Sequence, residues 1–413
     1  MFKLAKKGLT TVFLATGLPA GAAAQDTLTF LTWNHPQFAE QYQAVIDRFE
    51  SRHPDVTVEW VDKPGAELPA YYQTQLVAGT APDVVQLQGA LFLQYAEDGI
   101  LLDITDMLEA EPGTRARFNQ GVLDLFTYQD RQYLLPTQFG KTVLYYDKEA
   151  FSEAGLQKPS SNYDEFLAQL ETLAQDDQLG LVSLNFDWQF WPFMAAAGVE
   201  FLNDDGTRVA FNTPEAVAIV ERLADLTEKG AISSTSWTGR WVENNNEFAN
   251  RNAAILHSAY SAWGWFRGTA DWADQSTLGV AQFPGGYATP VNQGMGISSS
   301  TDNPKLAFEL LKMLTAYEAR QAYGERLRVL TGHVEADEEN KALFSESDQI
   351  TARIFDLNLT DLDKTTGTWQ ISNLNEISAA IWPTFQSALL GQEDAGEALE
   401  AAEQQANRLL RRR

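Results

Sequence analysis

Two stretches of this chain each lead from an apolar, strand-like segment through a polar turn into a helix-like segment. They are LVAGTAPDVVQLQGALFLQYAEDGILLDIT, residues 76–105, and YLLPTQFGKTVLYYDKEAFSEAGL, residues 133–156. This layout puts polar side chains at the ends of strands, where α/β proteins make their ligand contacts. The pattern therefore predicts an α/β fold with its functional residues at strand ends.

The order of elements around these stretches favours sheets that are mainly parallel. Strands are predicted at 27–33, 56–61 and 84–87, with helices between them, and this β-α-β-α-β order implies right-handed crossovers. A second series begins near Lys141, with a strand at 143–146 and a helix at 163–173. Ser161 and Asp164 resemble a capping box at the start of that helix. No low-complexity linker separates the two series, so we expect two lobes joined by several crossings.

The first 24 residues have the pattern of an export signal. Three lysines precede an apolar run at 9–18, and three alanines at 22–24 fit a cleavage site before Gln25. A retained anchor is the alternative, although a run this short falls below the ~20 apolar residues that span a bilayer. The sequence contains no Cys, which excludes a lipid-anchored cysteine and disulfides. We expect a soluble protein in the periplasm of a Gram-negative bacterium.

The chain is strongly acidic. Its net charge is −26, and loss of the three lysines in the signal would make it −29. Such a surface repels nucleic acid, so no nucleic-acid partner is expected. The charge does not indicate a cationic ligand, because acids on exposed helix faces commonly serve solubility.

Several separate blocks of the sequence resemble one known family. The blocks are FESRHPDVTVEW, GTAPDVVQLQG, LLPTQFGKTVLYYDKEAFSEAGL, FANRNAAILHSAYSAWG, LGVAQFPGG and NQGMGISSSTDNPKLAFELLKML. In this order they resemble the sugar-binding, family 1 extracellular solute-binding proteins of ABC importers. The resemblance implies a two-lobed type II periplasmic binding protein fold that closes on its ligand, each lobe a mostly parallel sheet flanked by helices. It implies a first lobe of 25–136 with 283–330, a second of 137–282 with 331–413, and a monomer that meets permease subunits in the membrane.

Tryptophan is concentrated in the second predicted lobe. Seven of the eleven tryptophans lie between residues 188 and 272. An aromatic face can cover the apolar C–H surface of a sugar while the hydroxyls stay at its edge. Core packing is the alternative for each of them. The resemblance places Trp241 and Trp263 where the family has stacking platforms, and it allows a later contact from Trp369.

Polar candidates follow the predicted strands of both lobes. Asn and Gln side chains both donate and accept hydrogen bonds, as sugar hydroxyls do. Their alternative role is local turn chemistry; for Tyr145 it is strand packing, and for Arg328 a surface position. The complete set of predicted ligand-binding residues is Trp33, Asn34, Gln88, Gln138, Tyr145, Trp188, Trp191, Trp241, Trp263, Trp265, Asn292, Gly294, Arg328 and Trp369.

The sequence lacks familiar catalytic and cofactor motifs. The four histidines have no metal-binding spacing, and Gly294-Met295-Gly296 lacks the third glycine of a dinucleotide loop, so neither a metal nor a cofactor is expected. There is no P-loop and no G-x-S-x-G elbow. A glycosidase needs only two carboxylates, but we expect no acid at the strand ends that the aromatic cluster would surround. A non-enzymatic role is therefore favoured.

These observations together predict a periplasmic protein that captures a neutral mono- or oligosaccharide and delivers it to a permease. A polyamine or peptide ligand is less compatible with the amides, since a cation requires carboxylates. A secreted glycosidase and a purely structural role are the alternatives from other classes.

Overall fold

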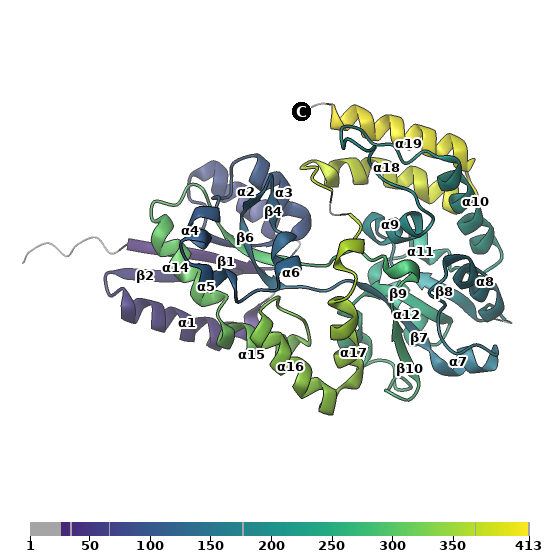
Figure 1. Cartoon of the computed structure of the whole chain (residues 1–413), viewed down its shortest axis with the longest axis horizontal. Helices are drawn as coiled ribbons and strands as arrows, with labels where there is room; N and C mark the ends of the chain where they lie inside the picture. Colours follow the sequence, from purple (N-terminus) through teal and green to yellow (C-terminus); the bar gives the residue numbers. More distant parts are fainter. Residues whose placement is uncertain (1–25, 34, 66, 176, 368, 412–413) are drawn as a thin grey trace, which may run out of the picture.

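The computed structural model describes residues 26–33, 35–65, 67–175, 177–367 and 369–411. Figure 1 shows two lobes side by side, each built around its own sheet. The predicted signal segment lies outside the described residues. Among the described residues, no helix is both long and apolar enough to cross a membrane. The two-lobed α/β architecture predicted from the sequence is confirmed.

The first lobe contains a five-stranded sheet whose core strands are almost entirely buried. Its order is β2 (Val56–Lys63), β1 (Asp26–Trp33), β3 (Val84–Gln88), β11 (Gln293–Ile297) and β6 (Leu134–Gln138). Strand β1 is parallel to β2 and β3, whereas β11 is antiparallel to β3 and β6. The ends of β1 and β3 therefore lie at the same edge as the start of β11.

Helices of the first lobe cover the faces of this sheet. They are η1 (Pro36–Phe38), α1 (Ala39–Arg52), α2 (Leu68–Ala78), α3 (Gly89–Glu97), α4 (Thr105–Glu109), α5 (Pro112–Arg115), α6 (Gln120–Asp124), α14 (Pro304–Leu314) and α15 (Tyr317–Leu327), with a small hairpin of β4 (Thr127–Tyr128) and β5 (Arg131–Gln132). Helix α1 buries one face, made by Tyr42, Val45, Ile46 and Phe49. Helix α2 ends at Gly79, whose φ of 70° is the left-handed cap that glycine adopts at little cost.

The second lobe contains a four-stranded sheet in the order β10 (Leu278–Ala281), β7 (Thr142–Asp147), β9 (Ala253–Ala259) and β8 (Leu179–Ser183). Its helices are α7 (Lys148–Glu153), α8 (Tyr163–Leu173), α9 (Asp187–Ala196), α10 (Pro214–Glu228), α11 (Thr235–Thr238), α12 (Trp241–Ala249), α13 (Ala262–Phe266), α18 (Leu374–Leu389) and α19 (Ala395–Leu410), with the single turn η2 (Pro284–Gly286). The last two helices pack on each other and on α10.

Both sheets are mixed rather than mostly parallel. In the second sheet only β8 and β9 are parallel, while β7 is antiparallel to both of its neighbours. The antiparallel strands are those next to the crossings: β6 leads into β7, and β10 leads back into β11. A strand that follows a crossing enters its sheet at the edge near the other lobe. It therefore runs opposite to the strands that end at that edge.

A third crossing consists of helices. Helix α16 (Val334–Ser347) packs against α15 and against α17 (Gln349–Asn358), and α17 packs against β10; the turn η3 (Leu362–Lys364) follows. Several crossings therefore join the lobes, as the sequence predicted, while the residue boundaries of the lobes stay a prediction.

The start of α8 differs from the prediction at one residue. Asn162, not Ser161, is the N-cap, and its side chain accepts a hydrogen bond from the Glu165 backbone at 3.0 Å. The proposed capping box between Ser161 and Asp164 was one residue out of register.

Candidate functional site

Three glutamines lie at the same level on neighbouring strands of the first lobe. In the sheet register Gln293 of β11 faces both Gln88 of β3 and Gln138 of β6. Gln88 is exposed and Gln138 is half-buried, whereas Gln293 is buried and accepts a hydrogen bond from the Gln86 side chain at 2.7 Å. The structure thus brings two predicted residues together at one sheet edge.

The neighbouring strand ends add further predicted residues to this edge. Trp33 is the last residue of β1 and is half-buried; Asn34 lies outside the described residues. Asn292 is also half-buried, and its carbonyl accepts a hydrogen bond from the Gly89 backbone at 3.1 Å. A Cβ atom at Gly89 would collide with the Asn292 side chain, so glycine there makes room for the amide.

Three partly exposed tryptophans lie beyond the strand ends of the second lobe. Trp188 is in the first turn of α9 and stacks on Phe186, with ring centroids 5.0 Å apart. Trp241 opens α12 and meets Trp265 of α13 edge to face, with centroids at 5.1 Å. Helices α9 and α13 follow β8 and β9, so Trp188 and Trp265 follow strands whose carboxyl ends lie at the same edge.

Three other predicted residues are buried in the core of their lobe. Tyr145 is fully buried, and its hydroxyl donates to the Tyr260 carbonyl at 2.6 Å. Trp191 retains only 4% exposure among aromatic rings. Gly294 is the second residue of β11, where a Cβ would collide with Leu134. These three residues present no free side-chain surface to a solute in this conformation, and their contact with a ligand stays a prediction.

Trp369 is half-buried, but its ring is occupied by protein. It stacks on Phe201 with centroids 4.0 Å apart and meets Trp191 edge to face. Core packing, the alternative weighed for this residue, is the arrangement in the structure.

Trp263 and Arg328 lie together around Asp348 rather than with the glutamines. Trp263 is 7% exposed and donates from Nε1 to the Asp348 carboxylate at 3.2 Å. Arg328 Nε and Arg267 Nη1 approach the same carboxylate at 3.5 and 3.6 Å. Burial, followed by the nearby Arg267 charge, lowers the pKa of Arg328. A cavity of about 860 Å³ borders this group, between α13, the turn before β10 and the α16–α17 junction.

Tyr260, which is 2% exposed, makes a contact between the lobes that the sequence reasoning missed. It directly follows β9, and its hydroxyl accepts a hydrogen bond from the Gln138 amide, which links the two lobes. The Gln138 amide oxygen in turn accepts from Tyr323 at 2.8 Å. A Cβ at Gly140 would collide with the Tyr260 ring. An aromatic residue immediately after a strand was the available signal.

An acid does lie beside the aromatic residues, contrary to expectation. Asp187 is the first residue of α9, after β8 and next to Trp188. Burial raises the pKa of this carboxyl, although hydrogen bonds from Ser378 and the backbone oppose the shift. The argument that no acid occupies these strand ends was therefore wrong. Within the described ranges, no three His, Asp or Glu side chains gather as a metal site.

Comparison with known proteins gives a consistent family assignment. A family model described as bacterial extracellular solute-binding protein matches residues 32–321. The chain is 25% identical to the sn-glycerol-3-phosphate-binding periplasmic protein UgpB of Escherichia coli K12, over 98% of this chain and 97% of that protein. It is 26% identical to a putative binding protein of Brucella abortus over 55% of this chain, and that match spans only 56% of the relative's length.

Solved structures share the fold across nearly the whole chain. A putative oligosaccharide periplasmic-binding protein from Synechococcus has a TM-score of 0.80 at 22% identity, covering 93% of this chain and 99% of that one. An ABC substrate-binding protein from Listeria monocytogenes in complex with cycloalternan has a TM-score of 0.75 at 23% identity, with coverages of 94% and 99%. At these identities the likeness shows the fold alone.

Proposed function

Because this chain belongs to the bacterial extracellular solute-binding protein family, we propose that it captures a neutral mono- or oligosaccharide between its lobes. We further propose that it is a periplasmic monomer that delivers the sugar to the permease subunits of an ABC importer. The observation that carries the proposal is the chemistry of the strand ends: amides on the first lobe and partly exposed tryptophans on the second.

This combination suits a sugar better than a charged solute. A sugar hydroxyl donates and accepts, and an amide can meet both requirements. Stacking on a tryptophan removes apolar sugar surface from water without leaving a hydroxyl unpaired. A phosphorylated ligand, such as the one that names UgpB, would require arginine or lysine for its charge. The described part of the amide edge instead consists of Trp33, Gln88, Gln138, Asn292 and the buried Gln293.

The proposed site is smaller than the set predicted from the sequence. It keeps Trp33, Asn34, Gln88, Gln138, Asn292, Trp188, Trp241 and Trp265, and it adds Asp187; Tyr260 is buried and holds Gln138 from the second lobe. The Tyr260–Gln138 hydrogen bond supports this set, because it joins a first-lobe amide to an aromatic residue of the second lobe. Tyr145, Trp191, Gly294 and Trp369 support the site from the core, and Trp263 and Arg328 belong to the Asp348 cluster.

A thermal-unfolding screen tests the proposed ligand class. A solute that binds only the folded state raises apparent stability by RT ln(1 + [L]/Kd), roughly 2.7 kcal/mol at 100 times Kd. Neutral mono- and oligosaccharides should stabilise the protein, whereas sn-glycerol-3-phosphate, spermidine and short peptides at equal concentration should not. Stabilisation by the phosphate ester alone would contradict the proposed neutral ligand.

The position of Asp187 gives a reason to test the alternative that the protein is a glycosidase. A carboxyl with a raised pKa can serve as a general acid. Each stabilising oligosaccharide should therefore be recovered intact after prolonged incubation, as judged by mass spectrometry. Cleavage products that disappear in Asp187→Asn would replace the binding role with an enzymatic one.

A further inference from the structure

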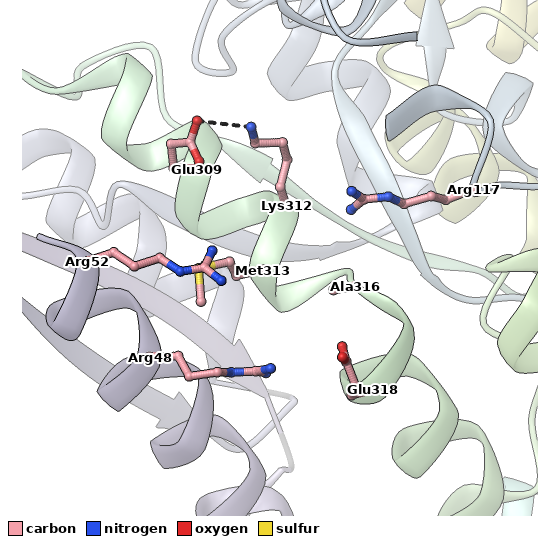
Figure 2. A pocket seen from close by; sticks show the side chains of 8 residues that line it. All are labelled: Arg48, Arg52, Arg117, Glu309, Lys312, Met313, Ala316 and Glu318. Carbon is pink, nitrogen blue, oxygen red and sulfur yellow. Dashed lines mark hydrogen bonds and ion pairs between the residues drawn. The ribbon is translucent and has the colours of Figure 1, made fainter. Parts of the chain in front are cut away.

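A second pocket, of about 240 Å³, lies on the first lobe among residues that play no part in the proposed sugar site. Figure 2 shows Arg48 and Arg52 extending from α1 and Arg117 extending from the segment after α5. Helix α14 and the start of α15 complete the lining. Three arginines from two separate segments thus converge on one small cavity.

The charges around this pocket do not cancel. Lys312 Nζ lies 2.8 Å from Glu111 and 2.9 Å from Glu309, so this group of one cation and two carboxylates has one net negative charge. By contrast, Arg48, Arg52 and Arg117 form no ion pair with any acid in the part of the chain that the structure describes. Glu318 adds a further negative charge, so the three arginines leave an excess of one positive charge around the pocket.

An excess of positive charge is unusual for this acidic molecule, although Arg48 and Arg52 are exposed, so water screens part of their repulsion. Arg48 and Arg52 are four residues apart on one helix, a spacing at which like charges destabilise the helix. The whole chain has a net charge of −26, with acids available almost everywhere to pair with arginine. A bound anion would relieve the repulsion that the protein's own acids leave in place.

We propose that this pocket binds a small dissolved oxyanion of the phosphate class. Arginine is suited to this ligand because its planar fork can donate two hydrogen bonds to one phosphate. Ala316, the N-cap residue of α15, lines the pocket and provides no side-chain cap, so backbone N–H groups of the first turn add to the arginine donors. The volume is below the ~300–1,000 Å³ typical of larger organic ligands, so a compact anion fits.

An anionic lipid headgroup offers the same chemistry, but the overall negative charge opposes approach to an anionic bilayer. The proposed ligand is therefore the free anion.

Calorimetric titration with inorganic phosphate at constant ionic strength tests the site. The wild type should bind phosphate, and combined Arg48→Gln and Arg117→Gln should weaken binding at least ~10-fold, as expected for loss of charge-assisted contacts. Glu318→Gln should tighten binding, because it removes the carboxylate that competes with the anion. Arg48→Gln with Arg115→Gln is the matched control: it removes the same two charges but leaves Arg117, since Arg115 lies outside the lining.

Three results would overturn the proposal. They are phosphate binding no stronger than that of chloride, equal losses in the arginine variant and the Arg115 control, or arginine-dependent sedimentation with phosphatidylglycerol vesicles. Sugar-induced thermal stabilisation should stay unchanged in all these variants. The anion site and the proposed sugar site can therefore fail independently.

Discussion

Two tryptophans that look equivalent in the sequence have different surroundings in the structure. Trp241 is partly exposed and contacts Trp265, whereas Trp263 is almost buried and donates to Asp348. The surroundings of each side chain, and not its distance from β9 along the chain, decide whether a ring can face a solute.

We predict that alanine substitution separates these two roles. Trp241→Ala should weaken sugar binding by roughly 1.5–3 kcal/mol through lost apolar contact, about 10- to 100-fold in Kd. Trp263→Ala should instead lower the free energy of unfolding by roughly 3–5 kcal/mol. Sugar titration and chemical unfolding of both variants measure the two effects. Normal sugar affinity in Trp241→Ala would remove that residue from the site.

A negative charge in place of an amide at the strand ends should leave the fold intact but weaken sugar binding. Gln88→Glu and Asn292→Asp each replace a donor with a carboxylate that only accepts, and they bring a charge against a neutral ligand. We expect sugar binding to fall about 10-fold in each variant, which corresponds to one lost hydrogen bond of roughly 1.5 kcal/mol. Exposed Gln392, after α18, provides the control Gln392→Glu. Wild-type affinity in both site variants would exclude these amides from the contact set.

At the scale of elements, local signals located the helices better than they located their first residues. The capping pattern was assigned to Ser161, but the side chain that reaches the first turn belongs to Asn162. Both residue types are good N-caps, so only the backbone geometry distinguishes them.

The cap of α8 gives a sharp element-scale prediction. Asn162→Ala should lower the free energy of unfolding by about 1 kcal/mol, the usual cost of removing an N-cap side chain. Ser161→Ala, one residue earlier and also exposed, should change it by less than about 0.5 kcal/mol. Urea unfolding of the two variants provides the comparison. A larger loss in Ser161→Ala would contradict the cap seen in the structure.

At the scale of the whole molecule, the crossings near Gly140 and Val291 and the α16–α17 pair connect two separate sheets. Few elements cross between the lobes, so the lobes can move as units about these segments. Contacts made by both lobes exist only when the lobes are closed, so a ligand that uses both favours closure.

We therefore predict that a stabilising sugar makes the particle more compact. Small-angle X-ray scattering with and without saturating sugar should show a smaller radius of gyration in the bound state. Tyr260→Phe, which removes the hydroxyl that bonds to Gln138, should bind more weakly and close less completely. An unchanged radius of gyration with proven binding would argue against hinge closure.

The sequence alone determined the features that depend on local chemistry. Local patterns predicted the strands β1 to β3, the helix α8 and the division into two α/β series, because these patterns report which faces are buried and where the backbone must turn. Residues that directly end a strand, such as Gln88 and Gln138, could be placed at a common edge for the same reason.

Only the tertiary structure decided which of the other candidates face a partner. Tyr145 and Trp191 are enclosed by segments distant in sequence, and Arg328 meets Asp348 through the α16–α17 junction. Contacts between segments distant in sequence also determine three other features. These are the strand direction near the crossings, the Tyr260–Gln138 link between the lobes and the three converging arginines. Burial and pairing of a side chain depend on what the rest of the chain packs against it, and a local pattern contains no information about that neighbour.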